Sequence, residues 1–441
     1  MTKNDINIVV KNQLCTACGS CKVACPVNAI SMQKTEIGRL YAKIDSNACT
    51  NCGICYDICP SYDAGNNVFI ENVNPFEGTV KQTYTGISTN QYIYENSQSG
   101  GLVTECLTYL FDTGKIDAAV VCIADYGKER PDVQAVVVRN KEDLLKSQRS
   151  SYTPIDMVSA LENIEKQERL AFVGLPCHIQ GIVALQNKFK KYQNIIYKFG
   201  LICDRTLSEA ITDVFLKIYW KKKIYWKKKI YWKKKIYWRN KKLFHNYITA
   251  PVIIEAENGM QKIIPAHIRH KLKDYFTSPR CRICFDKLNI HADIVFGDPW
   301  GMSNIDFVNG ESLVITRTYN GEKLIQELIT AERVKLNIAL FEEVKKGQLI
   351  EKRKEQVKVF SEVYKTNDWL LPAYWDKLDL SLQTKLSYSK SKKLISDFLS
   401  LENKSREDIA STVAKEIKIQ NIKSKVKMPF RILKKMIKSI I

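Results

Sequence analysis

Short apolar runs and amphipathic stretches alternate along residues 100–300, and they predict a body built of strands and helices. One amphipathic helix is expected over 100–111, since apolar residues recur there at helical spacing. Its apolar face consists of Leu102, Cys106, Leu107 and Leu110. Further helices are predicted over 178–189 and from about 208, and buried strands over 117–124, 169–175, 194–203 and 292–297. Strands that alternate with helices favour an α/β fold here.

The overall composition is that of a globular protein. The chain has 441 residues, of which 45% are hydrophobic and 26% charged, so it is neither disordered nor collagenous. Residues 1–10 lack the pattern of a signal peptide, and no apolar run is long enough to span a membrane. We therefore expect a cytoplasmic protein. Fourteen cysteines in such a chain indicate metal or redox chemistry rather than disulfides.

Much of the formal net charge of +21 is concentrated in two segments. The first is a repeat over 218–241, in which IYWKKK occurs three times and is followed by a degraded copy. Its letter-perfect period of six suggests duplication of a short DNA repeat. Rings interleaved with lysines would suit nucleic acid, but no recognition fold accompanies them, so we disfavour that function. These rings include Tyr225, Trp226, Tyr231 and Trp232.

The second basic segment is the C-terminal tail, residues 404–441. It carries eleven Lys and Arg residues against Glu407, Asp408 and Glu416. From Pro429 onward, apolar and basic residues alternate with roughly helical spacing. Such a helix can lie on an anionic membrane surface, which would place the protein at the membrane periphery. A terminal helix packed on its own domain is the alternative that we favour.

Eight cysteines near the N-terminus form two runs with the same spacing. The first run is Cys15, Cys18, Cys21 and Cys25, and the second is Cys49, Cys52, Cys55 and Cys59; a proline follows each run. In two-cluster ferredoxins the fourth cysteine of each run ligates the other cluster. The predicted ligand sets are therefore Cys15, Cys18, Cys21 and Cys59 for one 4Fe-4S cluster, and Cys49, Cys52, Cys55 and Cys25 for the second. A pair of zinc sites is the disfavoured alternative. Residues 1–75 resemble a bacterial-type double-cluster ferredoxin domain.

The other six cysteines differ in context. Cys106 and Cys122 fall on a helix face and within a strand, which indicates core packing. Cys177 and Cys203 each follow a predicted strand, where ligands bind in parallel sheets. Together with Cys281 and Cys284 they would make a set of four. From spacing alone, a third 4Fe-4S cluster, a zinc site and unrelated thiols all remain open.

Residues 97–101 place serines and glycines ahead of a helix. Free N–H groups at a helix start bind anions, so a flavin phosphate would fit there. The same residues serve equally as a simple helix cap, which we favour from the sequence alone.

Several motifs resemble those of the coenzyme F420 hydrogenase/dehydrogenase beta-subunit family. They occur in the family's order over roughly 80–320, and comprise Ser97–Thr104, Val173–Gly181, Gly200–Cys203, Cys281–Cys284 and Ala292–Gly301. The resemblance implies an FAD-binding α/β domain with a third 4Fe-4S cluster on Cys177, Cys203, Cys281 and Cys284. It also implies flavin-side contacts from Ser97, Ser99, Gly100, Gly101 and Asp298. Where the family often has Gly-Ser-Lys-Tyr, this chain has Arg149-Ser-Ser-Tyr152, so Arg149 would replace the lysine.

These observations predict an α+β and α/β protein in four parts. The parts are a double 4Fe-4S ferredoxin-type domain at 1–75, the N-terminal and C-terminal family regions at 76–168 and 169–330, and a helical basic segment at 331–441. The predicted function is an iron–sulfur flavoprotein oxidoreductase that exchanges a hydride with a small-molecule acceptor or donor. Coenzyme F420 and a metabolite of polysaccharide biosynthesis are both candidates, and a redox partner protein or ferredoxin is expected. The alternatives are a flavin-free electron-transfer subunit and a basic binding module.

Overall fold

The computed structural model describes residues 4–65, 68–125, 132–165, 167–219, 234–237, 252–256, 261–306 and 309–420. Most of the IYWKKK repeat and the last part of the basic tail, 421–441, lie outside these ranges. The predictions made for the repeat's rings and for the helix from Pro429 therefore fall outside the described residues. Within them, no helix is long and apolar enough to cross a membrane.

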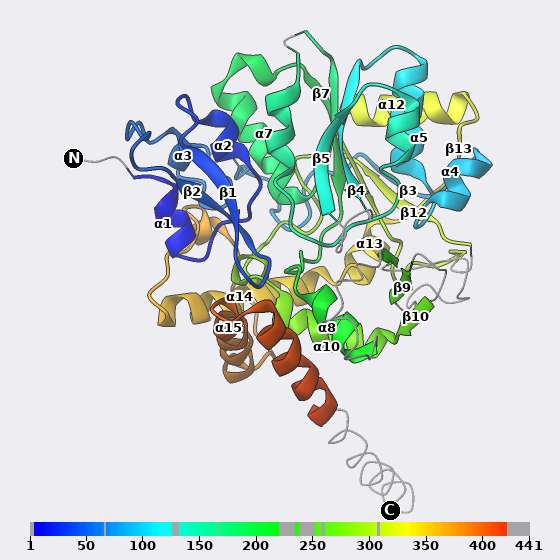
Figure 1. The fold of residues 1–441 in the computed structure, drawn as a ribbon. Helices are drawn as coiled ribbons and strands as arrows, with labels where there is room; N and C mark the ends of the chain where they lie inside the picture. Colours follow the sequence, from blue (N-terminus) through cyan, green and yellow to red (C-terminus); the bar gives the residue numbers. More distant parts are fainter. Residues whose placement is uncertain are drawn as a thin grey trace, which may run out of the picture.

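The N-terminal region pairs two cysteine-rich loops with short helices and a hairpin. Its elements are α1 (Ile6–Lys11), α2 (Ser20–Ala24), β1 (Ile30–Lys34), β2 (Leu40–Ile44) and α3 (Ile54–Asp57). β1 and β2 pair antiparallel, with Ile30 opposite Ile44. This region lies beside the main body (Figure 1).

An eight-stranded mixed sheet forms the body, in the order β13-β3-β12-β11-β7-β6-β4-β5. Its strands are β3 (Gln82–Ser88), β4 (Ala118–Asp125), β5 (Asp132–Val138), β6 (Leu170–Gly174), β7 (Ile195–Leu201), β11 (Ile294–Gly297), β12 (Ser312–Thr316) and β13 (Val334–Ile338). β4, β6, β7 and β11 are mutually parallel, and the other four strands run antiparallel to their neighbours. The four parallel strands are those that the sequence predicted; β3, β5, β12 and β13 were not predicted.

Helices cover both faces of the sheet. α5 (Leu102–Asp112) and α12 (Tyr319–Thr330) share one core with its strands, and the helix predicted over 100–111 is thereby confirmed. α7 (Pro176–Lys188) shares the other core with the 3₁₀ segment Met157–Asn163. Ala24 and Ile58 of the N-terminal region belong to that second core. The ferredoxin-like region is thus packed on the α7 side of the sheet (Figure 1).

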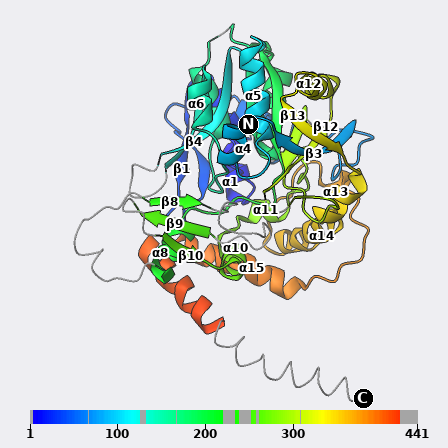
Figure 2. The same cartoon turned by 90° about the vertical axis from the view of Figure 1, so that its right-hand side faces the viewer.

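A layer of helices lies beneath the sheet and the N-terminal region (Figure 2). Its main helices are α8 (Ile211–Tyr219), α10 (Ala266–Phe276), α14 (Ile350–Thr366), α15 (Tyr388–Glu402) and a helix over 406–420. Smaller elements are α4 (Gln91–Asn96), α6 (Lys141–Leu145), α11 (Pro279–Arg282), α13 (Phe341–Gly347) and the sheet β8 (Lys234–Tyr237), β9 (Val252–Ala256) and β10 (Gln261–Ile264). Ile409, Val413 and Ile417 are buried in a core shared with α8, α10 and α15. The described part of the tail therefore packs on its own protein.

Candidate functional site

The two N-terminal cysteine loops have the same backbone conformation. Ala17 and Asn51 occupy equivalent positions with φ of 58° and 55°, and Gly19 and Gly53 follow with φ of 96° and 77°. A side chain on Gly19 would also collide with Ser159, since its Cβ would lie 2.7 Å from the serine Oγ. Each loop thus turns back on itself in the left-handed region just before a short helix.

The predicted ligands of the first cluster are neighbours. Burial raises the pKa of the Cys21 thiol well above its ordinary value, and the nearby thiols of Cys18, Cys15 and Cys59 add to the effect. Burial is also the main cause of the raised pKa of Cys59, and the nearby thiols of Cys18 and Cys15 raise it further. The fold therefore brings the fourth cysteine of the second run to the first three of the first run. Thiols held neutral in this way release protons when they bind metal.

The zinc alternative requires several side chains that converge on one ion. Across the described residues, no group of three or more His, Cys, Asp or Glu side chains converges closely enough to hold a single metal ion. The thiolates of a 4Fe-4S cluster bind different iron atoms, so they stand farther apart than the ligands of one ion. Local N–H···S hydrogen bonds are present, from Ala29 N to Cys25 Sγ at 3.3 Å and from Asn51 N to Cys49 Sγ at 3.4 Å.

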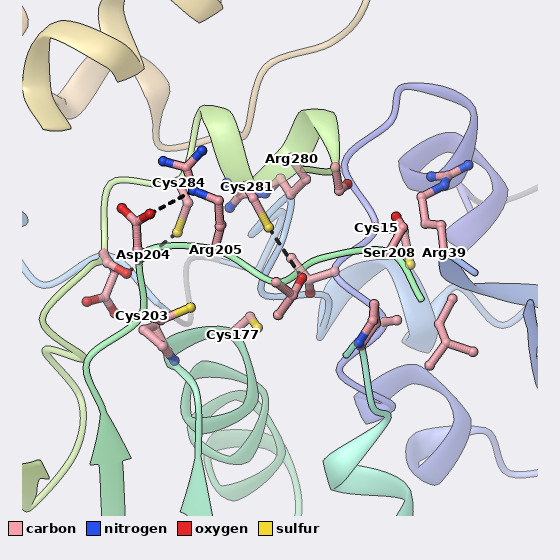
Figure 3. Close-up of a pocket in the computed structure, with 18 residues that line it drawn as sticks. Cys15, Arg39, Cys177, Cys203, Asp204, Arg205, Ser208, Arg280, Cys281 and Cys284 are labelled. Atoms are coloured by element: carbon pink, nitrogen blue, oxygen red, sulfur yellow. Dashed lines mark hydrogen bonds and ion pairs between the residues drawn. The ribbon is translucent and has the colours of Figure 1, made fainter. Parts of the chain in front are cut away.

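Four further cysteines from separate segments meet at one pocket. Cys177 lies in the first turn of α7, Cys203 follows β7, and Cys281 and Cys284 lie in and just after α11. Their sulfur atoms face a common centre (Figure 3). β6 and β7 are parallel and adjacent, so Cys177 and Cys203 lie at the same edge of the sheet. Ligation by these four thiols remains a prediction.

Charged side chains of both signs line this pocket: Arg39, Arg205 and Arg280, and Asp204 and Asp286. Burial raises the pKa of Cys177 and Cys203 well above the ordinary thiol value, and the neighbouring thiols raise both further. Cys177 lies in the first turn of α7, and a helix N-terminus lowers the pKa of a thiol. Burial has the larger effect here, so the pKa of Cys177 is raised. Burial alone would also raise the pKa of Asp204, but Arg205 and Arg353 hold that carboxyl well below its usual range.

Among the residues that line the pocket, Arg280 has the surroundings that best fit an anionic group. Arg280 is buried and lines the pocket together with the four cysteines. Its Nε and Nη1 atoms have no hydrogen-bond partner. A buried guanidinium with unpartnered nitrogens fits an anionic group such as a thiolate-ligated iron–sulfur cluster.

The same pocket reaches the first N-terminal loop. Cys15, Thr16 and Ala17 line it together with Cys177 and Cys281, and Figure 3 shows Cys15 to one side of these two cysteines. The Cys18 thiol is also close enough to Cys177 to raise its pKa, although burial and Cys203 have larger effects. The backbone joins the two sides as well, because Val158 N donates to Cys18 O at 3.0 Å. The cysteines predicted for the first cluster therefore lie beside those predicted for the third.

The predicted flavin-side loop is packed against the sheet. Gly100 N donates to Ser312 Oγ at 2.9 Å, and Ser99 Oγ lies 3.1 Å from the same oxygen. Ser97 Oγ donates to the Ser99 carbonyl at 2.6 Å. A Cβ on Gly100 would lie 2.2 Å from Gly86 O, so strand packing already explains this glycine. Gly101 has φ of 79° and caps α5.

The remaining flavin-side residues lie near this loop. Ser150 N donates to Gln98 Oε1 at 3.0 Å, and Gln98 Nε2 donates to the Tyr152 hydroxyl at 3.5 Å. Arg149 has φ of 84°, which is uncommon for a residue with a side chain and can mark a functional site. Asp298 directly follows Gly297, whose partner in the adjacent strand is Leu313. If this antiparallel pairing is continued by one residue, Asp298 lies opposite Ser312.

Comparison with known proteins decides the family. Residues 83–162 match the N-terminal model of the family described as coenzyme F420 hydrogenase/dehydrogenase, beta subunit, and residues 167–339 match the model of the C terminus of the same beta subunit. Residues 14–62 match a 4Fe-4S dicluster domain. The chain belongs to the coenzyme F420 hydrogenase/dehydrogenase beta-subunit family. In this beta-subunit-family protein, the third-cluster cysteines all fall in the C-terminal family region, whereas Ser97–Gly101, Arg149 and Tyr152 fall in the N-terminal one.

The relatives of this beta-subunit-family protein include whole subunits and a longer enzyme. It is 26% identical over 371 residues to the F component of the F(420)H(2) dehydrogenase of Methanosarcina mazei, covering 81% of this chain and 94% of that component. It is 27% identical to the beta subunit of the coenzyme F420 hydrogenase of Methanothermobacter thermautotrophicus, covering 60% of this chain and 90% of that subunit. It is 26% identical to the coenzyme F420-dependent sulfite reductase of Methanocaldococcus jannaschii, covering 84% of this chain but only 54% of that protein.

The fold of the beta-subunit-family protein is also found in a solved structure. A chain of the F420-reducing [NiFe] hydrogenase complex from Methanosarcina barkeri, studied with xenon, superposes with a TM-score of 0.52 and 21% identity. The match covers 68% of this chain and 99% of that chain. At this identity the likeness concerns the fold alone.

The sequence analysis missed the charged residues around the third-cluster pocket. Asp204 and Arg205 directly follow Cys203, and Arg280 directly precedes Cys281. Charged residues beside these cysteines were the available signal. Arg353 carried no such signal, because it lies far along the chain on α14 and only the fold brings its Nη1 to donate to the Cys281 carbonyl at 3.3 Å.

Proposed function

We propose that this protein is an iron–sulfur oxidoreductase subunit that carries electrons between an N-terminal pair of 4Fe-4S clusters and a third cluster in its body. The observation that supports the proposal most directly is the shared pocket. Cys15 and Ala17 of the first loop line it together with the four body cysteines. Electron transfer between centres requires that they be close, and this cavity joins both sets of cysteines.

The ligands would be divided as their spacing and neighbours indicate. Cys15, Cys18, Cys21 and Cys59 would hold the first cluster, Cys49, Cys52, Cys55 and Cys25 the second, and Cys177, Cys203, Cys281 and Cys284 the third. When bound, the clusters would take up and release single electrons. The chain buries the thiols of the first set, and Arg205 and Arg280 supply positive charge beside the third.

The second predicted cluster is well placed to exchange electrons with a partner protein. Its thiols, those of Cys25, Cys49, Cys52 and Cys55, are all partly exposed, whereas Cys15, Cys18, Cys21 and Cys59 are buried. The first predicted cluster adjoins the third. The order second, first, third therefore connects the surface with the body, and a redox protein or ferredoxin would bind near the loop 49–53.

A flavin in the body is the finer part of the proposal. It would lie near Ser97, Ser99, Gly101, Arg149, Tyr152 and Asp298, and it would convert single electrons into a hydride. Its support is the convergence of these segments through Gln98 and Ser312, together with the φ of 84° at Arg149. The hydride acceptor or donor would be coenzyme F420, the substrate that the names of the relatives carry. The relatives described above give no reason to extend the proposal to polysaccharide biosynthesis.

Anaerobic purification followed by iron, sulfide and flavin counts tests the proposal. Three filled sites would hold about twelve iron atoms. Cys177→Ala and Cys281→Ala should each remove about a third of the iron. Cys106→Ala is the matched control, because Cys106 is buried in the α5 core away from the pocket and should leave the count unchanged.

The flavin is scored separately from the iron. Flavin at one equivalent that dithionite and reduced F420 both reduce would support the full proposal. Twelve irons without flavin, even after reconstitution, would favour a flavin-free electron-transfer subunit. Full iron content in both cysteine variants would contradict the third cluster.

A further inference from the structure

Arg280 brings a positive charge into the third-cluster pocket without an acidic partner. The residue lies in α11, directly before Cys281, and only 3% of it is exposed. Its Nη2 donates to the Tyr374 hydroxyl at 2.8 Å, and its Nε and Nη1 have no hydrogen-bond partner. The guanidinium is thus held by one neutral hydroxyl, with two nitrogens unsatisfied.

The other arginines that line the pocket are each neutralised by a carboxylate. Arg205 Nε lies 2.7 Å from Asp204 Oδ2, and Arg39 Nε lies 2.6 Å from Glu402 Oε1. Arg353, which does not line the pocket, also pairs with Asp204, with its Nη2 3.0 Å from Oδ1. Arg280 differs from all three in its surroundings, because its hydroxyl partner carries no charge.

Tyr374 fixes the position of this charge. The ring is fully buried and packs edge-on against Phe285 with centroids 5.1 Å apart. Phe285 directly follows Cys284, so the ring that packs against Tyr374 belongs to the cysteine segment itself. Arg280 is consequently held beside Cys281 and Cys284 by packing that it cannot leave without opening the core.

A buried and uncompensated guanidinium is unfavourable unless an anion accompanies it. One-electron reduction adds one negative charge to a thiolate-ligated cluster. A fixed positive charge in a medium of low dielectric constant stabilises the reduced cluster more than the oxidised one. The reduction potential then becomes less negative.

We propose that Arg280 sets the reduction potential of the third cluster, raising it so that the reduced state is favoured there, and that Tyr374 is its positioning residue. The inference rests on the proposed function, since it requires a cluster on Cys177, Cys203, Cys281 and Cys284. A higher reduction potential at the third cluster would favour electron transfer to it, at the edge of the sheet where Cys177 and Cys203 lie.

A redox titration followed by electron paramagnetic resonance tests this role on the full chain, purified anaerobically. The signal that Cys177→Ala removes identifies the third cluster, and the N-terminal clusters serve as an internal reference. Arg280→Gln should shift the third-cluster midpoint to a more negative potential and leave the other two unchanged. Arg280→Lys keeps the charge and should restore most of the wild-type value.

Two control variants separate charge from shape. Tyr374→Phe keeps the guanidinium and should shift the midpoint less than Arg280→Gln does. Arg282→Gln removes a buried charge from the same helix, but Arg282 does not line the pocket and faces the Phe360 ring at 5.1 Å, so its shift should also be smaller.

The outcomes distinguish this inference from the proposed function. A wild-type protein without a third-cluster signal would overturn both. A full set of clusters with an unchanged third midpoint in Arg280→Gln would overturn the role of Arg280 alone. Arg280→Gln could also lose a third of its iron, which would mean that the third cluster is not bound. In that case, a full iron content in Arg280→Lys would support a role for the positive charge. Loss of the same iron in both variants would overturn that role.

Discussion

Arg39 and Glu402 form a buried ion pair that joins the tip of the β1–β2 hairpin to the last residue of α15. Arg39 Nε lies 2.6 Å from Glu402 Oε1, and the two side chains are 9% and 12% exposed. The N–H is not aligned with the oxygen as a hydrogen bond. Beside the pair, Ile37 is fully buried in the core of α8, α10 and α15. The C-terminal helices therefore hold the ferredoxin-like region by its hairpin.

Breaking this pair should loosen the hairpin. Glu402→Gln leaves the Arg39 charge buried and uncompensated, which we expect to cost about 3 kcal/mol. Amide hydrogen exchange over 30–44 should then become faster, whereas the double variant Arg39→Met/Glu402→Leu should cost less because no charge is left behind. Asp143→Asn, in an exposed pair with Lys146, is the control and should change little. Equal exchange in Glu402→Gln and wild type would show that the hairpin does not depend on the pair.

Gly100→Ala should destabilise the protein whether or not a flavin binds. The new Cβ would lie 2.2 Å from Gly86 O and 2.7 Å from Ser312 N, and neither backbone atom can move freely within the sheet. We expect a loss of about 2 kcal/mol or more in the free energy of unfolding, the usual cost of overpacking. Ser99→Ala removes the hydroxyl that lies 3.1 Å from Ser312 Oγ and adds no atom, so it should cost less, about 1 kcal/mol. A fully stable Gly100→Ala protein would show that the loop can leave the strand, and would return the glycine to the flavin.

Deleting one copy of the repeat, Ile224–Lys229, should leave iron content and thermal stability nearly unchanged. The fully buried apolar residues of α8, Ile211, Val214 and Phe215, precede the repeat, and Ile218, its first residue, packs against their core but lies outside the deleted copy. Phe215→Ala provides the contrast and should cost about 3–5 kcal/mol, since it empties a fully buried position. Loss of electron transfer in a folded deletion variant would mean that the repeat has a function.

His291 should make the protein less stable in mild acid. Burial lowers the pKa of His291 to about 4, and Arg317 and Lys198 oppose its protonation, although its Nε2 lies 2.6 Å from Val68 O. In the unfolded chain the pKa is about 6.5. The unfolded state therefore binds the proton first as the pH falls, and stability declines between pH 6.5 and pH 4 by up to about 3 kcal/mol.

Urea unfolding at pH 7.5 and pH 5 measures this dependence. His291→Gln should reduce it but not abolish it, because burial also lowers the pKa of His178 to about 4. His267→Gln is the control, because His267 is exposed on α10. The same loss of stability at pH 5 in His291→Gln and wild type would place the titrating group elsewhere.

The sequence alone determined the features that depend on residues close together in the chain, namely the cysteine-rich turns and the central strands. The cysteine spacing of residues 15–60 predicted a two-cluster domain, because each set of ligands is drawn from tight turns and one returning cysteine. The four central strands were predicted because a strand buried on both faces is a continuous apolar run. β3 and β13 were missed, since polar residues such as Gln82, Thr85 and Lys335 interrupt their pattern. Pairing with distant strands, and not local preference, makes them part of the sheet.

The tertiary structure alone decided which distant residues share the pocket. Cys177 and Cys203 could be assigned to one sheet edge from the sequence, but their approach to Cys15 depends on how the N-terminal region packs on α7. The partner of Arg280 is Tyr374, 94 positions away, and the hairpin is held by Glu402, which lies beyond every cysteine. Periodicity and ligand spacing report burial and local turns. They carry no information about which surfaces meet, because that choice depends on packing and charge compensation summed over the whole chain.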